Sequence, residues 1–311
     1  MRVVALAGGV GGARLADGLQ QALAPGELTV IVNTADDTER HGMLVCPDHD
    51  TVMYTLAGIA DPVQGWGIAG ETWRVMDQLA AYGEESWFRL GDRDIAAHIV
   101  RTAALRGGAS LTEASLRLQA AHGIPSRILP MADTPVRTRV LTDDGWLDFQ
   151  DYFVRLRQAP EVRGVSFDGA EGATATQAVR DAVGMAEAIV VCPSNPIVSV
   201  GPILAVGGVR QALAGARAAG VRVAAVSPII GGRALKGPAD RMLASLGHDV
   251  SAAGVARIYA GLVDVFVLDE VDAGLAPAVE SLGMRAIVTG TVMTDAAARL
   301  RLAEEILAAL S

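Results

Sequence analysis

Four aspartates lie close together near the start of the chain, in the segments NTADD and CPDHDT; they are Asp36, Asp37, Asp48 and Asp50. The apolar run LTVIV before NTADD predicts a strand, so the acids are expected at the carboxyl edge of a sheet, where open α/β folds bind ligands. Clustered carboxylates repel one another unless a cation neutralises them, and Mg²⁺ holding a substrate diphosphate would do so. The residues alone leave another interpretation open, in which these acids cap a helix and form a turn.

A glycine-rich turn, AGGVGGAR, follows the first apolar run and contributes Gly8, Gly9, Gly11 and Gly12. Such a turn between a strand and a helix lets backbone N–H groups approach a phosphate at the positive end of the helix. The nicotinamide-dinucleotide fingerprint G-x-G-x-x-G is not met, because the third glycine is missing in register. This disfavours an NAD-dependent oxidoreductase and leaves two interpretations, an anion site or a purely structural turn.

Two later loops, SNPIVSVGPIL and SPIIGGRALKGPADRML, each follow a predicted strand and are expected at the same edge. Ser194 and Asn195 offer side-chain hydrogen bonds to a base or phosphate. Gly231, Gly232 and Lys236 combine exposed backbone with positive charge, and Lys236 is the one lysine among 26 basic residues. Together these segments outline a pocket for a nucleotide diphosphate, in which Lys236 contacts phosphate.

Composition limits the class of protein. With 311 residues, 51% hydrophobic and 20% charged, the chain is expected to form one or two globular domains. The net charge of −9 argues against nucleic acid or an anionic membrane as partner. Cys46 and Cys192 are far apart and lack metal-ligand spacing, and neither a signal peptide nor a membrane-spanning run is evident. We therefore expect a soluble cytoplasmic protein.

The elements that must position these residues follow a βαβ pattern, since short β-branched runs alternate with alanine- and leucine-rich helical runs. This predicts a doubly wound, Rossmann-like α/β fold with a parallel sheet. The predicted strands are Val3–Ala7, Thr29–Asn33, Ile189–Cys192, Val221–Val226, Val263–Leu268 and Arg285–Thr289.

Residues 61–160 differ in character from the rest of the chain. They contain all four tryptophans, a helical stretch IAAHIVRTAALRGG, and a hairpin pattern around Asp144-Gly145. We interpret them as a mainly helical inserted subdomain with a β-hairpin, placed on a core formed by residues 1–60 and 161–311.

At this level of detail the sequence resembles the 2-phospho-L-lactate transferase family of coenzyme F-420 biosynthesis. The segments that carry the resemblance span nearly the whole chain: GGVGGAR, NTADD, CPDHDT, WFRLGDRDIAAHIVRT, ILPMADTPVRT, FQDYFV, SNPIVSVGPIL and SPIIGGRALKGPADRM. The departures are small, with alanine in NTADD where relatives often have glycine, and His49 in CPDHD where an aliphatic residue is common. Neither removes a carboxylate.

The resemblance implies a magnesium-dependent transferase. It would move a phospholactyl, phosphoenolpyruvyl or phosphoglyceryl group from a guanosine diphosphate ester to the ribityl hydroxyl of 8-hydroxy-5-deazariboflavin (FO), releasing GMP. Asp36 and Asp50 would hold the ion, with Asp37 and Asp48 as secondary candidates. We expect Asp50→Asn to abolish transfer and leave the fold intact, on the interpretation of this position as a surface-facing strand exit.

The insert would form the deazaflavin side of the site, through Trp87, Gly91, Asp92 and Asp94. Arg93 and Arg101 would offer guanidinium forks to anions. Individually, Trp87 and Phe88 also fit a packed core, and Asp92 also fits a helix start. His98 is interpreted as a helix residue without chemistry.

A regulator that binds nucleotide sugars, of the gluconeogenesis-factor type, is the alternative function, because that group shares a similar glycine-rich opening. The segments WFRLGDRD and ILPMADTPVRT favour the transferase. The sequence does not name the small acid on the donor or a general base. A homodimer is what the resemblance implies.

Overall fold

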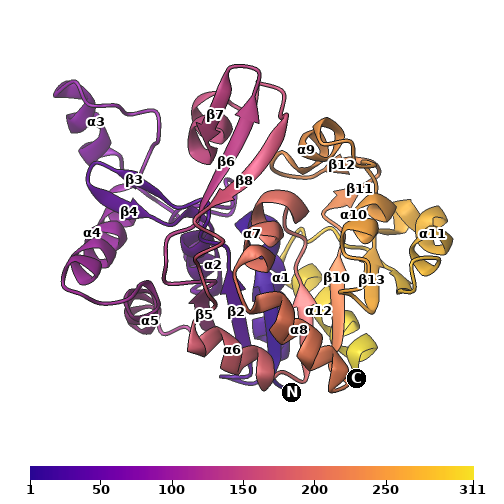
Figure 1. Ribbon diagram of the computed structural model, residues 1–311. Helices are drawn as coiled ribbons and strands as arrows, with labels where there is room; N and C mark the ends of the chain where they lie inside the picture. Colours follow the sequence, from indigo (N-terminus) through magenta and orange to yellow (C-terminus); the bar gives the residue numbers. More distant parts are fainter.

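A seven-stranded parallel sheet forms the centre of the computed structural model, which describes residues 1–311 (Figure 1). Its strand order is β14-β13-β10-β9-β1-β2-β5, and every neighbouring pair is parallel. The strands are β1 (Val3–Ala7), β2 (Leu28–Val32), β5 (Arg127–Pro130), β9 (Ala188–Val191), β10 (Arg222–Val226), β13 (Val265–Leu268) and β14 (Arg285–Val288). All six predicted strands lie in this sheet, which confirms the doubly wound α/β fold.

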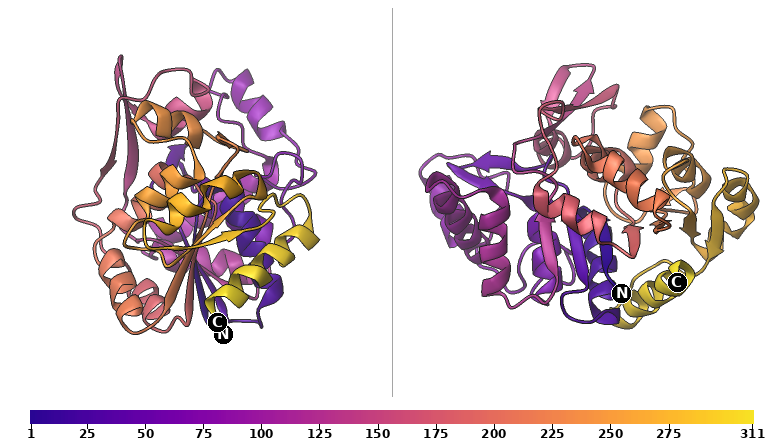
Figure 2. Two further views of the ribbon diagram at one scale, coloured as in Figure 1. Left: turned by 90° about the vertical axis from the view of Figure 1, so that its right-hand side faces the viewer. Right: turned by 60° about the horizontal axis from the view of Figure 1, so that its bottom comes forward.

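Helices cover both faces of the sheet, which Figure 2 shows nearly edge-on in its left view. Alternation along β1 explains the two layers: Val3 and Ala5 pack toward α1, α2 and α12, while Val4 and Leu6 pack toward α6, α7 and α8. The helices of the chain are α1 (Gly9–Ala22), α2 (Pro47–Leu56), α3 (Arg74–Ala81), α4 (Asp92–Arg106), α5 (Leu111–Ala121), α6 (Gln177–Gly184), α7 (Gly201–Ala205), α8 (Val209–Ala218), α9 (Ala239–Ser245), α10 (Ala252–Ile258), α11 (Ala276–Glu280) and α12 (Ala296–Leu310), with shorter turns η1 (Asp151–Arg155), η2 (Pro196–Val200) and η3 (Glu270–Leu275).

Strand order reverses between β1 and β9, because the chain winds outward from β1 through β2 to β5 and from β9 through β10 to β14. The carboxyl ends of all these strands meet at one edge, at the top in Figure 1, whereas both chain termini lie at the opposite end. A topological switch point of this kind leaves a crevice between the diverging loops, where ligands bind in such folds.

Smaller β elements stand above that edge (Figure 1). The sheet β7-β6-β8 contains the predicted hairpin, in which Gly145 has φ +107°. Two further hairpins are β3–β4 and β11–β12. The bounds are β3 (Thr38–Arg40), β4 (Met43–Val45), β6 (Arg137–Thr142), β7 (Gly145–Asp148), β8 (Gly164–Asp168), β11 (Ile229–Ile230) and β12 (Arg233–Ala234).

The structure divides residues 61–160 differently from the prediction. Strand β5 lies inside this range, yet it pairs with β2 at the edge of the central sheet, while β8 lies outside it and completes the sheet of the hairpin. The signal of β5 was weak because the strand has four residues and ends in Pro130, which only an edge strand accommodates readily. No helix has the length and apolar character that a bilayer-spanning segment requires.

Candidate functional site

A cavity of about 680 Å³ lies at the carboxyl edge, over the switch point between β1 and β9. Loops after β1, β2, β9 and β10 line it, together with α2, the start of α4, the hairpin region and the segment around Trp66. Of the predicted site residues, it is lined by Gly8, Gly9, Gly11, Asp36, Asp50, Trp87, Asp94, Ser194, Asn195 and Lys236. Gly12, Gly91, Asp92, Gly231 and Gly232 do not line it.

The glycine turn combines both of the interpretations that the sequence left open. Gly8, Gly9 and Gly11 line the cavity at the N-terminus of α1, where the first N–H groups have no partner within the helix. Gly8 and Gly11 also exclude a side chain, since a Cβ on Gly8 would lie 2.5 Å from Asp48 and one on Gly11 would lie 2.4 Å from the Pro193 carbonyl oxygen. The turn is therefore close-packed and open to an anion at once.

Two side chains after β9 have structural partners. Ser194 forms two hydrogen bonds with the Gly8 backbone across the switch point. Its Oγ accepts from the Gly8 N–H at 3.0 Å and donates to the Gly8 carbonyl at 2.8 Å. Asn195 caps η2 by accepting from the N–H groups of Ile197 and Val198. These bonds occupy the acceptor oxygen of each side chain. The Asn195 Nδ2 group has a weaker partner, since it donates to Met242 Sδ at 3.6 Å.

Asp36 and Asp48 form a carboxylate pair in which Asp36 is buried and Asp48 is half-buried. One amide group, Asn33 Nδ2, donates to Asp36 Oδ2 and to Asp48 Oδ2, each at 3.0 Å. Burial and the charge of Asp48 raise the pKa of Asp36 well above its usual value. Burial raises the pKa of Asp48 to about 6, although Asn33 and the nearby Gly9 N–H lower it.

The donor set of this pair fits a hard divalent cation. Asp36 Oδ1 is buried without a hydrogen-bond partner, and burial raises the pKa of both carboxyls without a cationic side chain to oppose it. Carboxylate oxygens are the ligands that Mg²⁺ prefers. Asp37, by contrast, is buried away from the cavity, where burial raises its pKa to about 7 against the opposing effects of Cys46 and Arg137.

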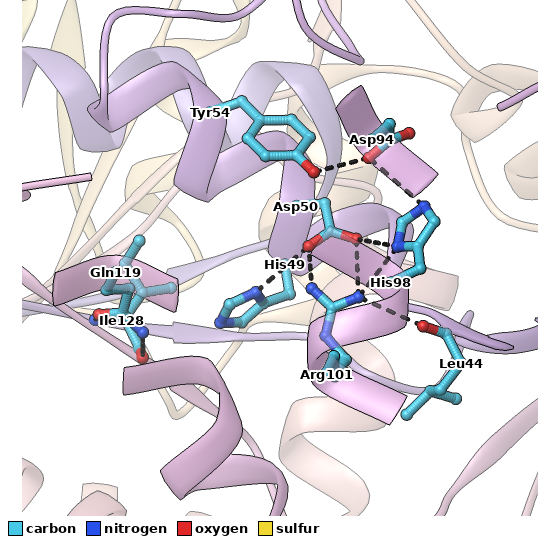
Figure 3. A network of polar contacts seen from close by, with 9 residues as sticks. All are labelled: Leu44, His49, Asp50, Tyr54, Asp94, His98, Arg101, Gln119 and Ile128. Carbon is cyan, nitrogen blue, oxygen red and sulfur yellow. Dashed lines mark hydrogen bonds and ion pairs between the residues drawn. The ribbon is translucent and has the colours of Figure 1, made fainter. Parts of the chain in front are cut away.

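The expectation that Asp50 is surface-facing is wrong. Asp50 lies in the first turn of α2 and is 4% exposed, and both of its oxygens accept hydrogen bonds from the guanidinium of Arg101, which is itself fully buried (Figure 3). Burial opposes ionisation of Asp50, but the charge of Arg101 more than offsets it and holds the pKa of Asp50 below its usual range. Arg101 is thus committed to an internal carboxylate rather than free for an anionic ligand.

His98 joins a buried polar chain that sequence reasoning missed. Its Nδ1 lies 3.6 Å from Asp50 and its Nε2 lies 3.4 Å from Asp94, which also accepts a 2.6 Å hydrogen bond from the Tyr54 hydroxyl (Figure 3). The signal was present in the spacing, since positions 94, 98 and 101 share one helix face. The helix α4 therefore presents acid, imidazole and guanidinium together toward α2.

The insert residues separate into two groups. Trp87 lines the cavity, and the Arg40 guanidinium lies 4.3 Å from its ring centroid. Asp92 instead accepts from the Thr72 hydroxyl and from the N–H groups of Arg74 and Val75, so it ties the start of α3 to α4. Gly91 leaves no room for a side chain beside Glu71, and Arg93 Nη1 donates to the Ala69 carbonyl.

The loop SPIIGGRALK also contains residues with a structural role and a residue that lines the cavity. Gly231 and Gly232 form the turn of the β11–β12 hairpin with φ of +57° and +77°, which explains glycine there without a ligand. Lys236 lines the cavity, and its Nζ donates to the Gln64 carbonyl at 2.8 Å.

Comparison with known proteins decides the family. The family model described as 2-phospho-L-lactate transferase CofD matches residues 3–285. The chain belongs to this family. It is 46% identical over 313 residues to a phosphoenolpyruvate transferase of Streptomyces griseus, covering 99% of this chain and 98% of the relative. It is 41% identical over 302 residues to the 2-phospho-L-lactate transferase of Methanosarcina mazei, covering 97% and 98% of the two chains.

Membership of the CofD family makes the chain a transferase enzyme of coenzyme F-420 biosynthesis. The fold has a solved counterpart in a member of the UPF0052 family from Bacillus halodurans, with a TM-score of 0.67 over 98% of each chain. At 14% identity this likeness concerns the fold alone.

Proposed function

We propose that this CofD-family enzyme transfers a phospholactyl, phosphoenolpyruvyl or phosphoglyceryl group from a guanosine diphosphate ester to the ribityl hydroxyl of FO. The ribityl oxygen forms a bond to the phosphorus nearer the small acid. The bond from that phosphorus to the bridging oxygen breaks, GMP leaves with the electron pair, and the proton of the ribityl hydroxyl is released to solvent.

The observation that carries this proposal is the Asp36–Asp48 pair beside the N-terminus of α1. Asp36 and Asp48 would hold Mg²⁺, which would supply neutralisation of diphosphate charge. Asp48 takes the place expected for Asp50, because both Asp50 oxygens accept hydrogen bonds from Arg101. The N–H groups of Val10 and Gly11 offer hydrogen bonds to phosphate oxygens at the positive end of a 14-residue helix. Positioning and charge neutralisation are what phosphoryl-type transfers chiefly require.

The apolar part of the cavity supports binding of a planar ring. Phe149 and Phe153 stack with ring centroids 5.4 Å apart, and both line the cavity, as do Trp87 and Phe88 from the insert. Aromatic walls of this kind bind flat heterocycles such as deazaflavin. A cavity of about 680 Å³ also lies within the usual range for small-molecule sites.

The test is a reconstitution that needs all three components. Mixing the protein with FO, MgCl₂ and the phosphoenolpyruvyl ester of guanosine diphosphate is expected to release GMP together with a product of FO plus the transferred group. Omission of FO or of magnesium is the control. Tight donor binding without GMP release would favour the regulator of the gluconeogenesis-factor type instead.

The identity of the small acid needs a competition of donors. The chain is similar both to relatives named phosphoenolpyruvate transferase and to relatives named 2-phospho-L-lactate transferase. Equal concentrations of the three donor esters, read by product mass, would rank them. The homodimer and the cytoplasmic location remain predictions.

Changing the two insert acids separately distinguishes binding from folding. We expect Asp94→Ala to weaken FO binding by about 10-fold, since Asp94 lines the cavity as a hydrogen-bond acceptor. Asp92→Ala is expected to lower the thermal midpoint without changing FO affinity, because its carboxylate serves only Thr72 and the start of α3. Fluorescence titration with FO measures both.

Tyr54→Phe is the matched control for Asp94→Ala. It removes the hydroxyl that donates to Asp94 at 2.6 Å and keeps the carboxylate. FO affinity is expected to stay near that of the wild type. Loss of affinity in Asp92→Ala but not in Asp94→Ala would reverse the assignment of the two acids.

A further inference from the structure

Two cations line the cavity without an acidic partner. Arg14 lies on α1 one turn after Val10, and Lys236 lies in the loop between β12 and α9. Lys236 and Val10, which lies one turn before Arg14, both approach Gly65, where an added Cβ would lie 2.8 Å from Val10 Cγ1 and 3.1 Å from Lys236 Nζ. Three segments that are distant in the sequence thus converge at this part of the wall.

Neutral carbonyls are the partners of both cations. Arg14 Nη1 donates to the Met293 carbonyl at 3.3 Å, and Lys236 Nζ donates to the Gln64 carbonyl at 2.8 Å. Asp61 lies nearby, but it forms no ion pair with Lys236, and one oxygen of its carboxylate accepts the N–H groups of Val63 and Gln64. Most of the donor capacity of the Arg14 guanidinium is therefore uncommitted.

The two cations also repel each other. Burial and the charge of Arg14 together lower the pKa of Lys236. Arg299, the guanidinium next to Arg14, has its own carboxylate partner in Asp17 at 3.0 Å. Two positive charges in one cavity wall, neither paired with an acid, favour a ligand that brings negative charge to them.

The first turn of α1 relates these cations to the carboxylate pair. At the start of this turn, Gly8 lies against Asp48. Val10, two residues later, lies against Gly65, which also lies close to Lys236. A polyanion lying along this turn would meet the Asp36–Asp48 pair at one end and the two cations at the other. An arginine fork also matches the paired oxygens of a carboxylate or phosphate.

We propose that Arg14 and Lys236 form an anion subsite for the negatively charged donor group that lies away from Asp36 and Asp48. The assignment rests on the proposed function, and Arg14 is a binding residue that sequence reasoning did not identify. The shared chemistry is an oxyanion, either the carboxylate of the small acid or a phosphate of the diphosphate. Binding replaces contacts to neutral carbonyls with charge-assisted hydrogen bonds.

Calorimetric titration of Arg14→Gln and Lys236→Gln tests the subsite. The probes are GDP and inorganic diphosphate, each with magnesium, and the KM of the phosphoenolpyruvyl donor ester is measured in the transfer assay. Arg233→Gln is the matched control, since it removes one charge from the exposed neighbouring hairpin outside the cavity. Thermal midpoints should change little, because neither cation has a strong internal partner.

The two anion sources give different results. If the subsite binds phosphate, each variant weakens binding of GDP and inorganic diphosphate by roughly 10-fold to 100-fold. If it binds the carboxylate of the small acid, the GDP affinity of each variant stays within about 3-fold of the wild type. The KM of the donor ester then rises by roughly 10-fold to 100-fold. Arg233→Gln matches the wild type in either case.

Unchanged GDP affinity together with unchanged KM in Arg14→Gln or in Lys236→Gln would overturn the paired subsite. Failure of the proposed function looks different, since then the wild type itself releases no GMP and does not bind GDP. In that event the binding of inorganic diphosphate still tests the subsite. Binding by the wild type that both variants lose supports the subsite, and absence of binding by the wild type overturns it.

Discussion

Asp50→Asn is expected to lower the free energy of unfolding by about 3–5 kcal/mol, because it leaves the Arg101 guanidinium charged, buried and without its anionic partner. Arg101 is 0% exposed, so water cannot replace the lost carboxylate. Equilibrium denaturation in guanidinium chloride measures the change. Transfer activity should fall as well, but in a protein that is less stable, which differs from the intact fold expected from the sequence.

The double variant Asp50→Asn with Arg101→Met separates the charge effect from packing. Replacing both members of a buried ion pair with neutral groups of similar size is much less destabilising than breaking the pair. Asp249→Asn is the surface control, since it breaks an ion pair whose members are each about half exposed and should change stability by less than about 1 kcal/mol. An Asp50→Asn protein as stable as the wild type would contradict the role given to Arg101.

Asp36→Asn is expected to reduce kcat by roughly 100-fold or more at millimolar magnesium, since it removes one of the two carboxylates proposed to hold the ion. The metal-free variant should be at least as stable as the wild type at pH 7. A carboxyl whose pKa is raised on folding costs stability once the pH exceeds its unfolded pKa, and the amide avoids that cost while keeping an acceptor for Asn33.

Magnesium provides the second measurement. The thermal midpoint of the wild type should rise on addition of MgCl₂, and that of Asp36→Asn should not. Asp37→Asn is the neighbouring control, because Asp37 is equally buried but does not line the cavity, and its turnover should stay within a few-fold. Undiminished turnover in Asp36→Asn would remove the ion from this position.

Local patterns in the sequence were sufficient for six of the seven strands of the central sheet. Continuous apolar runs such as VVALA and VVC are typical of parallel strands that are buried on both faces, so the run alone predicts the strand. Strand β5 escaped notice because its position depends on pairing with β2, a contact about 100 residues away in the chain. The carboxylate cluster was visible for the same local reason, since two acid pairs lie within one short segment.

Partners across the fold decided the roles within that cluster. Asp50 is separated from Arg101 by 51 residues, and nothing in CPDHDT indicates that a guanidinium from α4 is bound there. The pairing of Asp36 with Asp48 depends on Asn33, which sequence reasoning did not single out. Side-chain chemistry can be read from composition and spacing, whereas the assignment of each charge to its partner requires the tertiary structure.

The close contact between α1 and α12 has a consequence for synthesis on the ribosome. A Cβ on Gly18 would lie 2.2 Å from the Arg299 carbonyl oxygen, and Leu15 and Leu19 share a core with Leu302 and Ile306. The helix that begins at the glycine turn is synthesised well before the helix that covers it, because most of the fold lies between α1 and α12 in the chain. Vectorial folding therefore cannot bury this face of α1 early, and the nascent chain must keep α1 soluble until α12 has been made.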